Sequence, residues 1–155
     1  MSEYTATIAW QRSGARFIDN RYSRAHQWAF DGGATVPATA SPKVVPVPLS
    51  DPAGVDPEEA FVASLSSCHM LWFLSIAAKR GFTVDSYRDE AVGTMERIGE
   101  GRLAMTRVGL HPTIAFSGAP VPQPQEIEAM HQEAHHQCFI ANSVRTVVTV
   151  LPPSA

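Results

Sequence analysis

The stretch DPEEAFVASLSSCHMLWFLSIAAKRG, residues Asp56–Gly81, predicts a long helix, which is the clearest element of the chain. Asp56 supplies an N-cap acceptor, and Pro57 suits the first helical position. The two glutamates that follow place carboxylates beside the unpaired backbone N–H groups of the first turn. A Lys-Arg-Gly sequence ends the pattern with cations and a residue that adopts the left-handed conformation easily. The segment between these marks, about 24 residues, corresponds to roughly 36 Å of helix.

Apolar side chains cover more than one face of this predicted helix. A helix that is hydrophobic around most of its circumference is expected to be buried on most sides. One small sheet cannot enclose it, so the sequence predicts that a partner subunit covers part of it. The apolar positions are Phe61, Val62, Leu65, Met70, Leu71, Trp72, Phe73, Leu74 and Ile76.

Three shorter segments precede the helix. Residues 4–10 alternate between apolar and polar side chains, which is typical of an edge strand. A second strand is expected around residues 27–30, and the Asp-Gly-Gly sequence at 31–33 predicts a hairpin after it. Residues 36–52 carry five prolines and are therefore expected to form an extended connection.

The segments after the helix complete an α+β pattern. Residues 86–98 and 102–117 indicate two long strands joined by a turn at Gly-Glu-Gly, residues 99–101. A proline-bearing loop then leads to a helix over residues 126–137 and a β-branched strand over residues 144–151. Strands, a long helix, a strand pair, a helix and a strand in this order predict a single α+β domain over residues 1–155.

Composition and charge exclude several classes of function. The chain is 45% hydrophobic and 17% charged, as in folded globular proteins, and its net charge of −3 includes no basic cluster that would attract nucleic acid. The N-terminus lacks the pattern of a signal peptide, and the longest uncharged apolar segment, residues 70–78, is less than half of what a membrane span needs. We therefore expect a soluble cytoplasmic protein with no nucleic-acid or membrane partner.

Two cysteines are the first candidates for chemistry. Cys68 lies in the middle of the long helix, and Cys138 lies 70 residues later, at the end of the second predicted helix. This spacing matches neither a CxxC motif nor a zinc knuckle. Free cysteines are often small buried hydrophobes, and both residues could have that role. If they pair in a reducing compartment, a catalytic or redox-sensing function is expected.

Histidines offer an alternative chemistry. His131 and His135 share one face of the second helix and, together with His136 and Cys138, could hold a zinc-like ion or a small ligand. The sequence contains no HExxH motif and no GxSxG motif, so it predicts neither a zincin nor a serine hydrolase. A non-catalytic protein that binds metal or a small ligand, and a purely structural dimerisation module, remain open. His69, next to Cys68, has no assigned role.

Two motifs together carry a resemblance to a known family. The sequences DPEEAFVASLSSCHMLWFL and HHQCFIANSV resemble those of the OsmC/Ohr family of thiol peroxidases, and the resemblance extends through YSRAHQWAFDGG to the last strand. It implies an OsmC-like fold, with antiparallel sheets wrapped around long central helices in an intertwined homodimer. The Cys-His pair looks more like the OsmC or OsmC-like branches than the Ohr branch. Phe139 stands where many relatives have proline.

The resemblance also implies a reaction and its residues. Cys68 matches the peroxidatic cysteine, Cys138 matches the resolving cysteine, and Glu58 matches the glutamate of the family. The arginine of the family matches Arg24, a few residues before an Asp-Gly turn, with Arg21 as the second choice. The implied substrate is an organic hydroperoxide, the implied reductant is an external dithiol, and no cofactor is expected.

These residue types fit the chemistry. A thiolate attacks the peroxide, and a guanidinium favours the thiolate and stabilises the departing oxygen. A carboxylate orients the guanidinium, and a second thiol converts the sulfenic acid to a disulfide. Ten helical residues separate Glu58 from Cys68 by about 15 Å along the axis, so we expect Glu58 to come from the other subunit. Apolar side chains around the site are expected to favour alkyl or aryl hydroperoxides as substrates. These side chains are Phe61, Met70, Leu71, Trp72 and Phe139.

Overall fold

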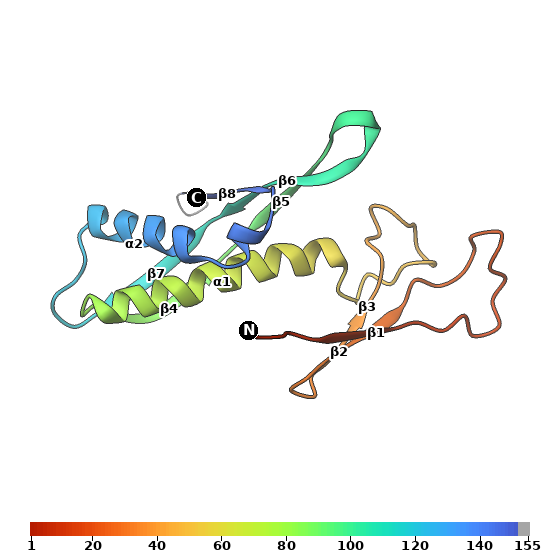
Figure 1. The fold of residues 1–155 in the computed structure, drawn as a ribbon, viewed down its shortest axis with the longest axis horizontal. Helices are drawn as coiled ribbons and strands as arrows, with labels where there is room; N and C mark the ends of the chain where they lie inside the picture. Colours follow the sequence, from red (N-terminus) through yellow and green to blue (C-terminus); the bar gives the residue numbers. More distant parts are fainter. Residues whose placement is uncertain (152–155) are drawn as a thin grey trace. The chain divides into compact units, whose positions relative to one another are not determined.

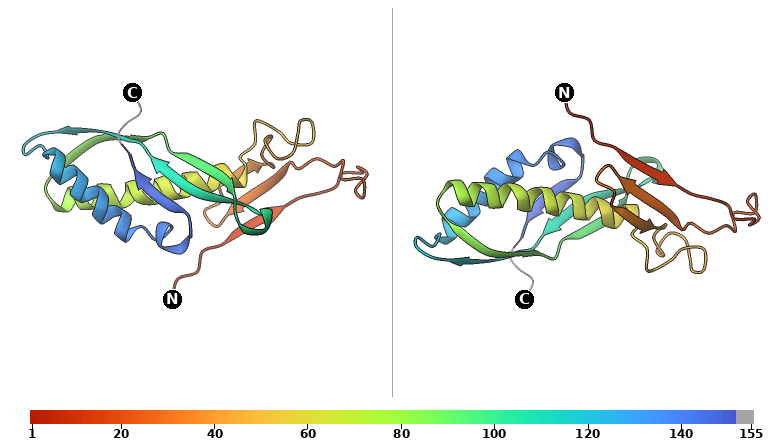
Figure 2. Two further views of the ribbon diagram at one scale, coloured as in Figure 1. Left: turned by 90° about the horizontal axis from the view of Figure 1, so that it is seen from above. Right: turned by 90° about the horizontal axis from the view of Figure 1, so that it is seen from below.

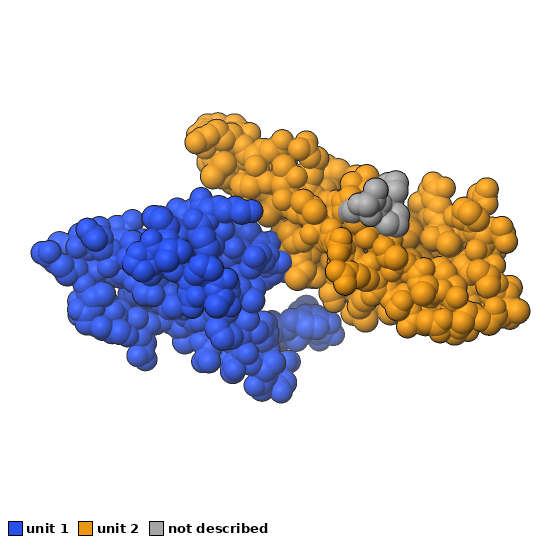
Figure 3. All heavy atoms as spheres, turned by 180° about the vertical axis from the view of Figure 1, so that it is seen from behind, with its two compact units in different colours: residues 1–60 blue, residues 61–155 orange. Residues whose placement is uncertain are grey.

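The computed structural model describes residues 1–151, and the chain divides into two compact units. Unit 1 comprises residues 1–60, and unit 2 begins at Phe61 (Figure 3). Each unit has its own strands, and we describe each by itself. The expectation of one domain over residues 1–155 stays a prediction.

Unit 1 contains a three-stranded antiparallel sheet. Its strands are β1 (Ala6–Ala9), β2 (His26–Phe30) and β3 (Thr35–Ala38), in the order β1-β2-β3 (Figure 1). In the turn between β2 and β3, the N–H of Gly33 donates to the carbonyl of Phe30 at 3.0 Å, and Gly33 has a φ of 84°. The predicted hairpin is therefore confirmed, and its last glycine adopts the left-handed conformation that the turn requires.

One expectation for unit 1 was wrong. The proline-rich segment 36–52 is not wholly a connection, because β3 runs through Pro37 to Ala38. β3 is an edge strand of its sheet, and an edge position tolerates a residue that has no N–H to donate. Beyond β3 the chain folds back, and the hydroxyl of Thr39 accepts the N–H of Asp51 at 2.9 Å.

Helix α1 spans Pro57–Lys79, as its sequence predicts. The N–H of Glu59 donates to the carboxylate of Asp56 at 2.8 Å, and the N–H of Asp56 donates to the carboxylate of Glu59 at 3.3 Å, which is a reciprocal capping box. At the other end Gly81 has a φ of 81°, and the N–H of Phe82 donates to the carbonyl of Ala77 at 3.0 Å. Both ends are therefore closed by local hydrogen bonds.

The two long strands expected after α1 are each divided into two. The observed strands are β4 (Thr83–Asp89), β5 (Val92–Arg97), β6 (Leu103–Leu110) and β7 (Pro112–Ser117). β4 pairs with β7 and β5 pairs with β6, both antiparallel, and the predicted turn lies between β5 and β6 at η1 (Gly99–Gly101). At the break, the carboxylate of Asp89 accepts the N–H of His111 at 2.6 Å. Between the β4-β7 sheet and the β5-β6-β8 sheet, the Asp89 side chain thus accepts a backbone N–H that a strand carbonyl would accept within a sheet.

The second helix and the last strand complete unit 2. Helix α2 spans Pro124–Gln137 and begins two residues before its predicted start, because Gln123 and Glu126 form a capping box ahead of Pro124. After the short turn η2 (Ala141–Ser143), strand β8 (Val147–Val150) pairs parallel with β6. α2 packs against the later part of α1 (Figure 2), where its buried residues Met130 and Ala134 join the cluster around Phe73.

Only one stripe of α1 is buried within the chain. Leu65, His69, Phe73 and Ile76 face the interior, and the spacing of three and four residues is that of one helix face. Leu71, on another face, is 61% exposed. α1 is long and apolar enough to cross a membrane, but the core helix of a soluble protein passes the same test, and 28% of its most apolar window is buried here. Much apolar surface of α1 is therefore left uncovered by this chain.

Candidate active site

The fold brings the two cysteines together. Cys68 lies on α1, and Cys138 is the C-cap residue of α2. Both are free thiols, and Cys138 lies close enough to Cys68 for the two side chains to interact. Cys138 is 1% exposed, and its Sγ also accepts the N–H of Ala141 at 3.4 Å. Two thiols that lie 70 residues apart in the sequence are thus neighbours in space.

The surroundings of Cys138 hold it in the thiol form. Burial and, after it, the neighbouring Cys68 thiol raise the pKa of Cys138 to about 11, against the opposing effect of the Ala141 N–H. Cys138 therefore carries its proton at neutral pH.

A pair of histidines links α1 to α2, and one of them, His69, directly follows Cys68 in the sequence. Nε2 of His69 lies 3.0 Å from Nδ1 of His131, and the two rings stack with centroids 5.3 Å apart and planes inclined by 12°. His69 is 1% exposed, and Phe73 packs on the ring of His131 with centroids 4.4 Å apart. Burial lowers the pKa of each histidine to about 4, so both rings are neutral at physiological pH.

A half-buried carboxylate supports α1 from the strands. Asp89, at the end of β4, accepts a hydrogen bond from the hydroxyl of Ser66 on α1. Burial raises the pKa of the nearby Tyr87, and the charge of Asp89 raises it further. In the part of the chain that the structure describes, the buried polar atoms without a hydrogen-bond partner include Nδ1 of His69 and Oη of Tyr87.

Arg24 is held firmly within unit 1. Its guanidinium donates to the carbonyls of Asn20, at 2.9 Å, and of Tyr22, and to the side-chain oxygen of Asn20 at 2.7 Å. It also stacks on the ring of Tyr22, 3.9 Å from the centroid. Arg21 is exposed, and only its backbone N–H is hydrogen-bonded among the described residues, to the carboxylate of Asp19 at 3.1 Å. Of the two arginines, Arg24 alone is fixed in place.

Glu58 lies in the first turn of α1, within unit 1. One of its carboxylate oxygens, Oε2, is buried and has no hydrogen-bond partner among residues 1–151. A buried carboxylate oxygen without a donor is costly, so this atom is available to a donor from outside the described chain. The roles of Glu58 and Arg24 in one site with the thiols stay predictions.

The alternative ion site expected from the histidines does not form. His131 turns inward to His69, His135 and His136 are exposed, and Cys138 is buried against Cys68. Across residues 1–151, no three histidine, cysteine, aspartate or glutamate side chains converge in a way that could hold a metal ion. The expected cluster of His131, His135, His136 and Cys138 was therefore wrong as a set of ligands.

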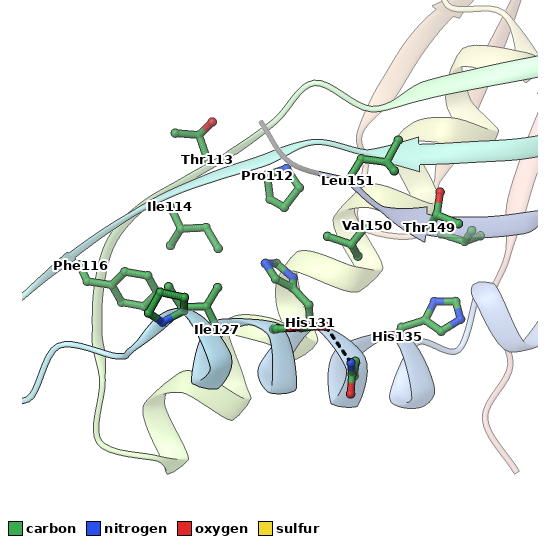
Figure 4. Close-up of a pocket in the computed structure, with 14 residues that line it drawn as sticks. Pro112, Thr113, Ile114, Phe116, Ile127, His131, His135, Thr149, Val150 and Leu151 are labelled. Carbon is green, nitrogen blue, oxygen red and sulfur yellow. Dashed lines mark hydrogen bonds between the residues drawn. The ribbon is translucent and has the colours of Figure 1, made fainter. Parts of the chain in front are cut away.

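A cleft of about 950 Å³ opens between α2 and strands β7 and β8 (Figure 4). Apolar side chains line most of it, among them Ile114, Phe116 and Ile127. His131 projects into the cleft from α2. Its ring is also hydrogen-bonded to His69, the residue that follows Cys68 on α1.

The sequence of the chain matches a known family. A model of the OsmC-like protein family matches residues 50–151, a segment that contains α1, α2 and both cysteines. The chain belongs to the OsmC-like family. This confirms the family suggested by the two cysteine motifs and the α+β class with an OsmC-like fold.

Solved structures of the family resemble this chain closely. An OsmC-like protein of unknown function from Vibrio cholerae is 56% identical over 98% of this chain and 99% of that one, with a TM-score of 0.95. Organic hydroperoxide resistance proteins from Legionella pneumophila and Elizabethkingia anophelis share the fold at 16% and 17% identity, with TM-scores of 0.70 and 0.72. The first alignment covers 99% of this chain and 98% of that one, and the second covers 100% and 98%. A comparison with curated proteins found no match.

Sequence reasoning missed the partners of His69 and Asp89. His131 was considered only as an ion ligand or a solvated residue, and nothing in its spacing indicates a contact with His69, 62 residues away. The placement of Asp89 at the junction of β4 and β5 depends on strand pairing, which local sequence does not show.

Proposed function

We propose that the protein is a thiol-dependent peroxidase that reduces organic hydroperoxides to alcohols. The observation that carries the proposal is the closeness of the Cys68 and Cys138 thiols, which two different helices bring together. A buried resolving thiol close to a less buried partner is the arrangement that disulfide chemistry requires. Family membership and the fold shared with organic hydroperoxide resistance proteins support the same reaction class.

The reaction balances in two steps. The thiolate of Cys68 attacks the terminal peroxide oxygen, the O–O bond breaks, and the alkoxide takes a proton and leaves as the alcohol. Cys68 is now a sulfenic acid. The sulfur of Cys138 then attacks that of Cys68, the S–O bond breaks, and water leaves with the proton of the Cys138 thiol. An external dithiol reduces the disulfide and restores both thiols.

Arg24 is proposed to favour the thiolate and to stabilise the departing oxygen. Its guanidinium is fixed by Asn20 and Tyr22, yet two of its five N–H groups, including Nε–H, have no partner among residues 1–151. A fixed cation with spare donors suits this task, whereas the exposed Arg21 is not fixed. Glu58, with a buried unpaired oxygen, is the proposed carboxylate partner of the guanidinium.

We propose a homodimer in which α1 packs against a second copy of the chain. Only 28% of the most apolar window of α1 is buried within the chain, and Leu71 is 61% exposed, so a second copy would cover apolar side chains that this chain leaves in contact with water. The dimer would let Glu58 of one subunit serve Cys68 of the other, because ten residues of straight helix separate the two within one chain. The apolar surroundings favour an alkyl or aryl hydroperoxide, and we place the protein in the cytoplasm.

The test is a count of free thiols before and after one equivalent of cumene hydroperoxide. We expect the loss of two thiols per chain, with formation of the Cys68–Cys138 disulfide seen by mass spectrometry. The Cys68→Ser variant should lose none, and Cys138→Ser should lose one and accumulate the sulfenic acid. An unchanged number of free thiols in the native protein would contradict the proposed reaction. Equal turnover of hydrogen peroxide and cumene hydroperoxide would contradict the expected preference for organic hydroperoxides.

A further inference from the structure

His69 and His131 connect the two helices that carry the thiols. His69 directly follows Cys68 on α1, and His131 lies on α2 seven residues before Cys138, about 10 Å along the helix axis. The hydrogen bond between the two rings therefore joins the residue after Cys68 to α2, the helix that ends at Cys138.

This hydrogen bond restricts both distance and rotation. Between two neutral rings one nitrogen must donate and the other must accept, so the 3.0 Å contact defines which atoms meet. The rings are nearly parallel, at 12°, and Phe73 covers the ring of His131. His69 is 1% exposed, which leaves its ring little space for another orientation.

A second polar contact near these helices is weaker. Arg80, one residue beyond the end of α1, forms an ion pair with Glu133 of α2 at 2.6 Å, and both side chains are more than a third exposed. Exposed ion pairs contribute little to stability because water and salt screen them. Among the described residues, the histidine pair is therefore a largely buried polar link between α1 and α2, in addition to the two thiols themselves.

The geometry points to His69 and His131 as positioning residues that hold Cys138 in line for attack on the oxidised Cys68. The inference rests on the proposed function, and it names residues that the two-cysteine chemistry does not itself require. Formation of a disulfide is sensitive to placement, because the Cα atoms must lie about 4.4–6.8 Å apart with matching Cβ directions. Without the link, the end of α2 shifts relative to Cys68 and the two sulfurs meet less often.

The experiment measures the effective concentration of the Cys68 and Cys138 thiols toward each other. Full-length protein is equilibrated in glutathione redox buffers, trapped by alkylation, and the Cys68–Cys138 disulfide is quantified by mass spectrometry. Two variants remove the hydrogen bond, His69→Leu and His131→Leu. Two others keep a side-chain nitrogen near the original position, His69→Gln and His131→Asn. The matched control is His136→Leu, which changes an exposed histidine of the same helix.

We expect a fall in effective concentration of ten- to a hundredfold, as an order of magnitude, in the leucine variants. The amide variants should stay close to the native value, and the control should be unchanged. Native effective concentrations in both leucine variants would overturn the inference. So would a loss in the amide variants as large as in the leucine variants, because it would reflect core volume and not the hydrogen bond. If the leucine variants do not fold, the amide variants decide, and a loss in either overturns the inference.

The equilibrium contains no peroxide, so it separates this inference from the proposed function. A native protein that forms the disulfide in glutathione buffer but loses no thiols to cumene hydroperoxide would contradict the peroxidase and leave the role of the histidines standing. If the native protein reacts with the hydroperoxide and the leucine variants form the disulfide as well as it does, the peroxidase is supported and the role of the histidines is contradicted.

Discussion

Ser66 donates its hydroxyl hydrogen to the carboxylate of Asp89, which ties α1, two residues before Cys68, to the end of β4. We expect Asp89→Ala to lower the free energy of unfolding by about 1–3 kcal/mol, because the partly buried hydroxyl of Ser66 and the backbone N–H of His111 both lose their acceptor. Urea denaturation measures the change. The matched control is Asp85→Ala on the same strand, whose carboxylate accepts the hydroxyl of Ser117 at 2.9 Å on the exposed surface. Equal losses in both variants would contradict a special role for the inner contact.

Cys138 is expected to resist ionisation. Burial raises its pKa to about 11, and the neighbouring Cys68 thiol contributes to the same shift. The Cys68→Ala variant leaves one thiol, which can be titrated by the ultraviolet absorbance of the thiolate. We expect its pKa to be below that of Cys138 in the native protein, yet above the value of about 8.5 for a free cysteine, because burial remains. A thiolate already formed at pH 8 in this variant would contradict the prediction.

The neutral histidine pair predicts a loss of stability in mild acid. In the unfolded chain each histidine titrates near about 6.5, whereas both folded pKa values are about 4. Between these values the unfolded state binds more protons, so the free energy of unfolding falls as the pH drops from about 6.5 to about 4. Below that range both states are protonated and the contribution stops changing. Above about 6.5 it is constant.

A double variant isolates this effect from the carboxylates. His69→Gln with His131→Asn cannot titrate, so its stability should depend less on pH over the same range. Two neighbouring side chains shift the pKa values of the pair. Asp89 raises the pKa of His131, and His135 lowers the pKa of His69. Urea unfolding at several pH values compares the two proteins, and parallel pH profiles would show that the pair does not contribute.

Mixed dimers test whether Glu58 acts across subunits. Glu58→Gln and Cys68→Ser chains are each expected to be inactive as pure dimers. If Glu58 serves the thiol of the other subunit, a dimer of one chain of each kind has one complete site and recovers about half of the native activity per dimer. If Glu58 serves its own chain, no complete site forms and the mixture stays inactive. Differently tagged chains allow the mixed dimer to be purified before hydroperoxide turnover is measured.

The sequence predicted those parts of the fold that are set by neighbouring residues. The ends of α1 follow from Asp56, Pro57 and Gly81, whose capping roles need only a few residues on either side. The hairpin at Gly33 is local in the same sense. The division of the strands at Asp89 was missed, because it depends on which strand each half pairs with and on a contact with the backbone of His111.

The candidate site divides in the same way. The cysteine motifs allowed Cys68 and Cys138 to be paired through a family resemblance, and in the structure the two thiols lie close together. The contact between His69 and His131 has no local pattern, since it arises where α2 packs on α1. An i, i+4 histidine spacing suggested an ion site because the sequence does not show which way each ring turns.

The parallel pairing of β8 with β6 has a consequence during synthesis of the chain. Arg107 of β6 pairs with Val147, which the ribosome adds forty residues later. Until β8 emerges, β6 keeps one edge of unpaired N–H and C=O groups, and such edges recruit strands from other molecules. A chain that stops before Val147 would therefore leave this edge of β6 open, and we expect such truncated products to aggregate more readily than chains that form β8.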